Sequence, residues 1–122
     1  MIALGIDLIE VDRIRRSIQS AHFCERVFGA QERQQLAARS MAAESAAACF
    51  AAKEAFGKAL GCGVRGFSLA EVQLLREPSG RPYLSLCGRA LLLAEERGLE
   101  FSVSVTHTKQ YAAVVVAAEK KA

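Results

Sequence analysis

The chain has 122 residues, of which 52% are hydrophobic and 24% are charged. This length is typical of one globular domain, so we expect a single domain over residues 1–122. The hydrophobic fraction excludes a disordered chain, and no apolar run approaches the roughly 20 residues needed to cross a bilayer. Sixteen Lys and Arg residues against thirteen Asp and Glu give a net charge of +3, which is too small to indicate a nucleic-acid-binding protein.

The first residues lack the positively charged segment of a secretory signal, and Asp7 interrupts the apolar run before it reaches export length. The sequence therefore predicts a cytoplasmic protein. The four cysteines form no C-x-x-C pair: they are Cys24, Cys49, Cys62 and Cys87. This spacing predicts reduced, mostly packed thiols rather than a zinc site.

The N-terminal half predicts one strand followed by helices. A strand is expected near residues 2–10, where apolar residues alternate with the period of a half-buried strand: Ile2, Leu4, Ile6 and Leu8. Asp12 is expected to cap a short, basic amphipathic helix, and two more short helical patterns follow at residues 23–28 and 32–36. The alanine-rich residues 41–60 predict a long helix that ends at Gly61.

The C-terminal half predicts two antiparallel pairs of strands around a helix. We expect strands at 72–75 and 82–86 joined by a turn at 78–80, a helix at 89–97, and strands at 101–105 and 112–118. Helices and strands mix without regular β-α-β alternation. The sequence therefore predicts an α+β fold with a mainly antiparallel sheet.

Three polar clusters interrupt these elements: Asp7 with Glu10, Lys53 and Glu54 with Lys58, and Thr106 to Lys109. Glu54 and Lys58 are one helical turn apart, so a solvent-exposed ion pair is the alternative to a functional site. Asp7 could likewise be an ordinary strand acid, and His107 an exposed loop histidine. If Asp7 and Glu54 meet, their oxygens could hold a divalent cation such as Mg²⁺ beside phosphate groups.

Three segments together resemble the bacterial holo-[acyl-carrier-protein] synthase family. They are Gly5-Ile6-Asp7-Leu8-Ile9-Glu10, the FAAKEAFGKALG of residues 50–61, and the SVSVTHT of residues 102–108, with a Gly80-Arg81-Pro82 turn between the last two. The resemblance implies a phosphopantetheinyl transferase, an α+β subunit that forms a trimer with active sites at subunit interfaces. Coenzyme A would donate its 4′-phosphopantetheine arm to a serine of apo acyl carrier protein, for fatty acid biosynthesis, and adenosine 3′,5′-bisphosphate would leave.

Carried over position by position, the resemblance assigns roles to the residues of these segments. Asp7 and Glu54 would be the Mg²⁺ ligands and, with Lys58, the catalytic residues. Lys58 would lie near the pyrophosphate, and His107 would enter the coenzyme A site, across an interface. Further coenzyme A contacts would come from Gly80, Arg81, Pro82, Thr106 and Thr108.

These residue types suit the attack of a serine hydroxyl on the β-phosphorus of coenzyme A. A metal ion and cationic side chains stabilise the charge that builds on the phosphoryl oxygens. A metal-bound water, Glu54 or Lys58 could accept the serine proton, and the sequence does not choose among them. The acceptor protein is typically acidic in this family, so four arginines are expected to steer it in a salt-dependent manner: Arg13, Arg15, Arg16 and Arg26.

Two other classes of function compete with a transferase. One is a non-catalytic module that binds a carrier protein or coenzyme A, and the other is an RNA-binding domain, for which no RNP-type motif is present. The sequence also departs from the family, which commonly has an arginine where this chain has Cys49. A thiol is a weaker donor than a guanidinium, so we expect the donor site to lack one phosphate contact, partly replaced by Arg65.

Overall fold

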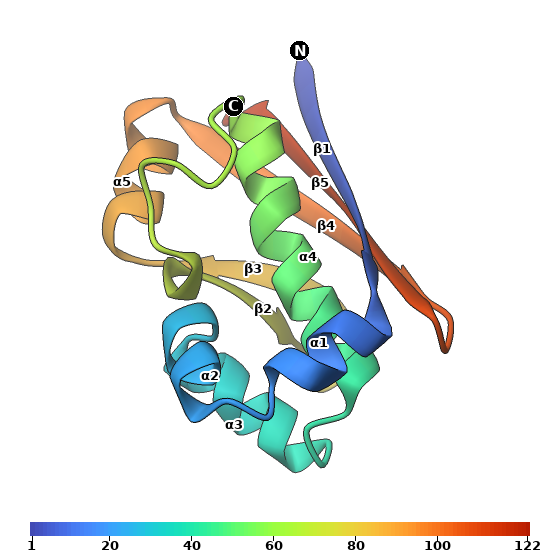
Figure 1. Cartoon of the computed structure of the whole chain (residues 1–122). Coiled ribbons are helices and arrows are strands. Elements are labelled where there is room, and N and C mark those ends of the chain that lie inside the picture. The colour runs from blue at the N-terminus through green and yellow to red at the C-terminus, as the bar shows by residue number, and fades with distance from the viewer.

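A computed structural model describes all residues, 1–122, as a small α+β domain (Figure 1). Its elements are β1 (Ile2–Glu10), α1 (Val11–Ser17), α2 (Ala21–Val27), α3 (Ala30–Ala38), α4 (Ala43–Leu60), a 3-10 turn η1 (Leu69–Glu71), β2 (Val72–Arg76), β3 (Pro82–Leu86), α5 (Gly88–Glu96), β4 (Leu99–His107) and β5 (Tyr111–Lys120). The predicted α+β class and antiparallel pairing are confirmed.

The strands form two separate antiparallel sheets. Helix α4 packs against both sheets and against the smaller helices. One sheet has the order β1-β5-β4, and the other is the β2-β3 hairpin. Figure 1 shows α4 crossing one face of the three-stranded sheet, with α1, α2 and α3 gathered near its N-terminal end and α5 beside the sheet. The other face of the three-stranded sheet has no helix over it.

Helix α4 forms because alanine dominates it and its single glycine, Gly57, faces the loop that follows. The helix ends where predicted, at Gly61, which adopts the left-handed conformation with φ of +80°. It begins at Ala43, two residues later than predicted. Ser40 and Met41 have positive φ values, of 56° and 51°, so the chain turns sharply there before the helix can start.

The buried side of β1 is the reverse of the one that its apolar pattern predicted. The alternating residues Ile2, Leu4, Ile6 and Leu8 point away from α4 and are 58–65% exposed. The opposite side, which carries Gly5 and Ile9, is buried against α4. Gly5 lets the strand lie directly against the helix backbone, and Ile2, Leu4, Ile6 and Leu8 form an exposed row on the outer face.

Several predicted boundaries also need correction. Asp12 lies in the first turn of α1 and is not its cap, because the helix already begins at Val11 after Glu10. The start of α2 is capped instead by Ser20, whose hydroxyl accepts a hydrogen bond from the Phe23 N–H at 3.2 Å. No helix of the chain is both long enough and apolar enough to cross a membrane.

Candidate active site

The site begins with a close approach of β1 to α4 at Gly5. A Cβ atom at Gly5 would lie 1.9 Å from the Ala55 carbonyl oxygen and 2.6 Å from the Ala59 amide nitrogen. Only glycine lets the strand and helix backbones come this near. Since side chains alternate along a strand, Asp7 projects from the same side as Gly5 and reaches the helix surface.

Asp7 meets Lys58 across this contact. The Lys58 Nζ donates to Asp7 Oδ1 at 3.2 Å and to the Ile6 carbonyl oxygen at 2.9 Å. The Asp7 side chain is 17% exposed and that of Lys58 is 52% exposed. Because Glu54 precedes Lys58 by one turn of α4, or roughly 5.4 Å, the two carboxylates and the ammonium group share one patch of surface.

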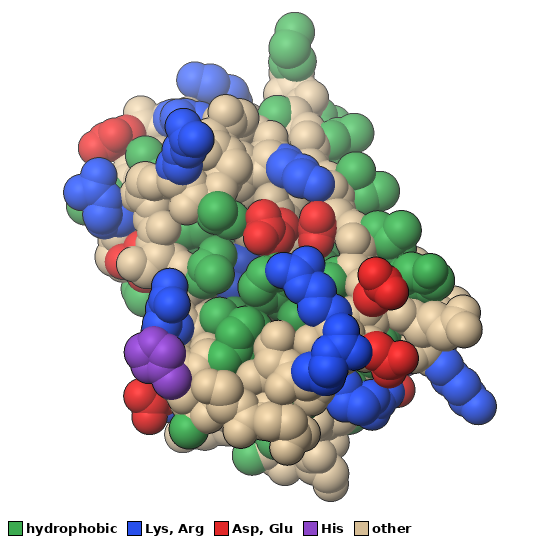
Figure 2. All heavy atoms as spheres, in the orientation of Figure 1, with side chains coloured by type: hydrophobic (Ala, Val, Ile, Leu, Met, Phe, Trp, Pro, Cys, Tyr) green, Lys and Arg blue, Asp and Glu red, His purple; other side chains and the backbone are tan.

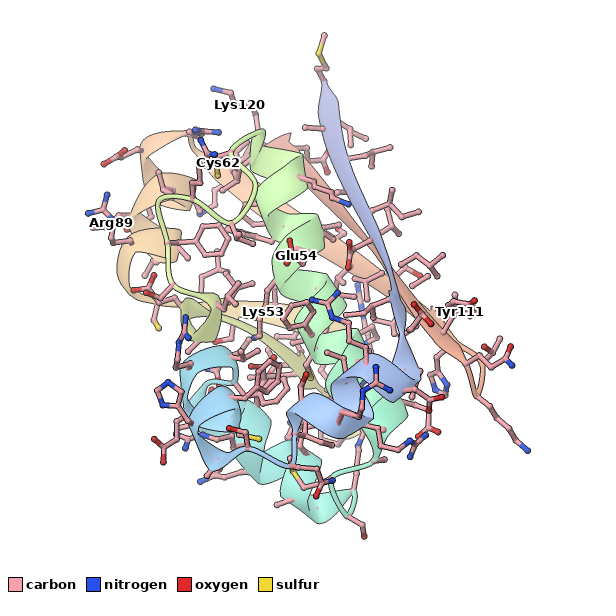
Figure 3. The ribbon with its side chains drawn as sticks, viewed as in Figure 1. Lys53, Glu54, Cys62, Arg89, Tyr111 and Lys120 are labelled. Atoms are coloured by element: carbon pink, nitrogen blue, oxygen red, sulfur yellow. The ribbon has the colours of Figure 1, made fainter.

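The carboxylate of Glu54 is free of protein partners. It takes part in none of the chain's four ion pairs, so the alternative of a Glu54–Lys58 pair is not what the structure shows. Figure 3 shows Glu54 on the side of α4 that faces the viewer, and Figure 2 shows acidic side chains side by side over α4 and β1. The structure thus brings the predicted residues Asp7, Glu54 and Lys58 together.

The donor set suits a hard divalent cation. Carboxylate oxygens are ligands that Mg²⁺ prefers, and this ion binds through one or two carboxylates while water and substrate phosphates complete its octahedron. No group of three or more His, Cys, Asp or Glu side chains is placed to hold a metal ion. A cation here would therefore rest on the two carboxylates of Asp7 and Glu54, with Lys58 beside them.

Lys53 does not belong to this patch, although it is the sequence neighbour of Glu54. Its side chain is fully buried, and its Nζ donates to Glu32 Oε1 at 2.6 Å and to the Val72 carbonyl oxygen. Glu32 is also fully buried and accepts from the Leu74 N–H at 2.8 Å. In Figure 3 Lys53 lies behind α4 in the interior, whereas Glu54 lies at the surface.

The residues of the β4–β5 turn lie away from the carboxylates within one chain. His107 is exposed at the end of β4, and β5 separates that strand from β1. Neighbouring strands are about 4.8 Å apart, so two strand spacings separate His107 from the β1 edge. Thr106 is exposed, and Thr108 Oγ1 accepts from the N–H groups of Gln110 and Tyr111, which fixes the turn.

The predicted residues 80–82 lie in a third region of the surface, separate from the carboxylate patch and from the β4–β5 turn. They make the β2–β3 turn, where Gly80 has φ of +94° and Arg76 Nη1 donates to its carbonyl oxygen at 3.2 Å. A hollow of about 250 Å³ opens beside this turn, and its lining joins the hairpin to β4: Glu77, Arg81, Pro82, Tyr83, Phe101, Ser102 and Val103. This hollow shares no lining residue with the Asp7–Glu54 patch.

The four arginines predicted for docking surround the helical end of the molecule. Arg13, Arg15 and Arg16 are exposed on α1. Arg26 is exposed at the end of α2 and lines a hollow of about 460 Å³ whose other walls are mostly apolar: Val27, Val64, Phe67, Ser68 and Leu69. Figure 2 shows basic side chains on both sides of a central apolar area on this face.

Position 49, which the sequence analysis placed in the phosphate site, is buried in the structure. Cys49 is 5% exposed, and its Sγ faces the Leu74 carbonyl oxygen at 3.8 Å between α4 and β2. Burial raises the pKa of this thiol, so it stays neutral. Arg65 is exposed in the loop that follows α4. All four cysteines are free, and Cys87 is exposed.

The comparisons with known proteins identify the family of the chain. Residues 3–116 match the family model described as the 4′-phosphopantetheinyl transferase superfamily, and the chain belongs to that superfamily. It is 43% identical to a holo-[acyl-carrier-protein] synthase of Treponema denticola, with 98% of each chain covered. Its fold is similar to that of a holo-[acyl-carrier-protein] synthase from Neisseria meningitidis, with a TM-score of 0.89, 31% identity, and 98% and 100% of the two chains covered.

A second solved structure includes a ligand. An ACPS–CoA complex from Chronobacterium ammoniagenes is similar to the chain with a TM-score of 0.85 and 27% identity, and covers 100% of this chain and 99% of the other.

Two structural features were not assigned from the sequence. The close approach at Gly5 is one, although the residue stands in the quoted motif. The buried Lys53–Glu32 pair is the other. Positions 49, 53, 56 and 60 share one side of α4, and the other three members of that row are Cys49, Phe56 and Leu60. This apolar row was a signal that Lys53 would be buried.

Proposed function

We propose that the protein transfers the 4′-phosphopantetheine arm of coenzyme A to a serine hydroxyl of apo acyl carrier protein, for fatty acid biosynthesis in the cytoplasm. Adenosine 3′,5′-bisphosphate is the leaving product. The observation that supports this most is the patch formed by Asp7, Glu54 and Lys58, in a chain of the 4′-phosphopantetheinyl transferase superfamily. The names of the relatives and the CoA complexes support the choice of donor and acceptor. A non-catalytic binding module is not favoured.

Asp7 and Glu54 would hold a magnesium ion in this site. When bound, the ion would bring positive charge to the diphosphate of coenzyme A and to the charge that develops during transfer. Glu54 would lose no protein partner when the ion binds. Asp7 would exchange part of its contact with Lys58 for a contact with the ion. The two residues come from different elements, so the close approach at Gly5 is what makes them a joint site.

Lys58 would stabilise the phosphoryl oxygens directly. Its Nζ already donates to two oxygen atoms, those of Asp7 and Ile6, which suits a role as a cationic donor better than a role as proton acceptor. A donor that is fixed before the reaction costs no reorganisation as charge develops. The serine proton has to leave during the attack. This arrangement supports a carboxylate of the patch or a water molecule, rather than Lys58, as the acceptor of that proton.

A homotrimer with active sites at its interfaces would unite the three separated parts. Within one chain, the carboxylate patch, His107 and the turn at residues 80–82 lie at different places. One coenzyme A molecule could meet all three if a neighbouring subunit supplied some of them. The exposed apolar row of β1 offers a surface for this assembly: Ile2, Leu4, Ile6 and Leu8.

His107 would then enter the coenzyme A site of a neighbouring subunit, with Thr106 and Thr108 holding the β4–β5 turn that carries it. Gly80, Arg81 and Pro82 would contact the adenine side of coenzyme A, in the hollow beside β4. The exposed arginines of α1 and α2 would guide an acidic carrier protein to the carboxylate patch. Such steering falls as salt screens the charges.

Intact-mass measurement tests this proposal. Purified protein, coenzyme A, Mg²⁺ and an apo acyl carrier protein should give a carrier whose mass has increased by one phosphopantetheine arm. The isosteric variants Asp7→Asn and Glu54→Gln should each lower kcat/KM by at least about a hundredfold while remaining folded, because each removes one anionic ligand. Mn²⁺ binding, measured separately, should weaken in both variants. No mass gain with the parent protein would overturn the proposed reaction, and full activity of either variant would overturn its assignment.

A further inference from the structure

The exposed arginines of α1 differ in the side chains that contact their guanidinium groups. Arg15 has acidic partners on both sides, with its Nε 3.4 Å from Asp12 Oδ1 and its Nη2 4.0 Å from Glu44 Oε1. Arg13 takes part in none of the chain's four ion pairs. Its guanidinium carbon lies over the ring of Phe50, 5.7 Å from the ring centroid. The charge of Arg15 is therefore partly neutralised, whereas that of Arg13 is not.

Phe50 is a fixed platform for this guanidinium. Its side chain is 9% exposed within α4, and its ring stacks on that of Phe23, with centroids 6.2 Å apart and an interplanar angle of 23°. Phe23 in turn packs edge-on against Phe28 at 6.0 Å. A flat cation over an aromatic face is attracted by the ring electrons, and the packed rings beneath keep that face in place.

The stack is also close to the carboxylate patch. Phe50, Glu54 and Lys58 are spaced by four residues on α4, so they follow one another along the same side of the helix. The Arg13–Phe50 contact therefore lies about one turn, or roughly 5.4 Å along the axis, from Glu54. An acidic group that binds Arg13 would be near any serine presented to the patch.

We propose that Phe50 is a positioning residue for carrier-protein recognition: it holds the Arg13 guanidinium extended and unpaired, ready for a carboxylate of the carrier protein beside the acceptor serine. This inference rests on the proposed transfer to an acidic carrier protein and deepens it. Arg13 binds the carrier protein. Arg15, with Asp12 and Glu44 beside it, contributes less to this binding. Preorganisation of a long side chain improves binding because less freedom is lost when the partner arrives.

The test compares variants in steady-state transfer to apo acyl carrier protein. Phe50→Leu removes the ring face but keeps an apolar side chain, and Arg13→Lys keeps the charge but loses the flat guanidinium. Each should raise the carrier KM by about two- to tenfold, the effect of freeing one long side chain before binding. The coenzyme A KM should stay unchanged. Arg13→Ala should raise the carrier KM at least as much, and adding Phe50→Leu to it should cause no further rise.

Phe56→Leu is the matched control, because it shortens another buried aromatic of α4 that no arginine covers. It should lower the melting temperature without raising the carrier KM. If Arg13→Ala leaves the carrier KM unchanged, docking at Arg13 is wrong. If Arg13→Ala raises it but Phe50→Leu and Arg13→Lys do not, or if the effects of Phe50→Leu and Arg13→Ala multiply, docking stands and the positioning role is wrong. The mass assay tests the transfer reaction independently of all these outcomes.

Discussion

The buried pair of Lys53 and Glu32 ties four parts of the chain together. Lys53 belongs to α4 and Glu32 to α3, and their remaining hydrogen bonds go to backbone groups of β2 and to the Gly29 N–H that precedes α3. Both side chains are fully buried. Each charge is acceptable there only because the other neutralises it and the backbone satisfies the rest.

Lys53→Met should therefore destabilise the protein strongly. The substitution keeps most of the apolar stem but leaves the Glu32 carboxylate buried without its cation, which typically costs about 3–5 kcal/mol. Urea denaturation would measure the loss in free energy of unfolding. The double variant Glu32→Gln with Lys53→Met should recover part of that loss, because no uncompensated charge remains. A single variant as stable as the parent would contradict this account of the pair.

Cys49 gives a residue-level prediction about alkaline pH. Burial raises the pKa of its thiol above the usual value of 9.0. Below pH 9 the thiol is protonated in both folded and unfolded chains, so its contribution to stability is constant. Above about pH 9 the unfolded chain loses this proton while the folded chain keeps it, so the free energy of unfolding falls by up to about 1.4 kcal/mol per pH unit.

Urea titrations over a series of pH values would detect this slope. Cys49→Ala should make the alkaline fall in stability shallower than in the parent. Cys87→Ala, at an exposed position, is the matched control and should follow the parent curve. Identical pH dependence in the parent and Cys49→Ala would show that the thiol ionises equally in both states.

At the scale of elements, the packing of β1 on α4 decides whether the carboxylates meet. Gly5→Ala places a methyl group 1.9 Å from the Ala55 carbonyl oxygen, so the strand has to move off the helix. We expect a loss of about 1–3 kcal/mol in stability, the usual cost of overpacking. We expect a larger loss of transfer activity, since Asp7 moves away from Glu54. Denaturation and kcat/KM should be measured together.

Ala3→Val is the control for this prediction. It adds bulk on the same side of β1, two residues earlier, where the chain is exposed. It should leave activity and stability close to those of the parent. Equal activity of Gly5→Ala and Ala3→Val would show that the close approach at Gly5 is not needed for the site.

The elements themselves were largely predictable because their signals are local. The alanine content of α4 and the glycine that ends it depend on neighbouring residues alone, and so does the β2–β3 turn. The buried face of β1 was not predictable from alternation, because a period of two does not say which face meets the helix. Lys53 was grouped with Glu54 by adjacency, although consecutive helix residues point in different directions.

For the whole molecule, the main feature is the outer face of the three-stranded sheet. The exposed apolar row of β1 lies beside Ala113, Val115 and Ala117 of β5, and Ser102, Ser104 and Thr106 of β4 complete the face. The face thus changes from large and apolar at one edge to small and polar at the other. An uneven surface of this kind suits a ring of copies, in which each interface joins two different patches.

Mixing two inactive variants tests the shared site of the proposed homotrimer. A Glu54→Ala chain lacks a carboxylate but keeps His107, and a His107→Ala chain keeps the carboxylate. If each site takes Glu54 from one subunit and His107 from its neighbour, co-refolding the two variants in equal amounts should create intact sites. Random assortment makes about a quarter of all sites complete, so activity should recover to about a quarter of the parent value. Each variant refolded alone is the control. If the mixture is no more active than these controls although pull-down of an affinity-tagged variant recovers the untagged one, both residues serve the same subunit's site and the shared-site proposal is wrong.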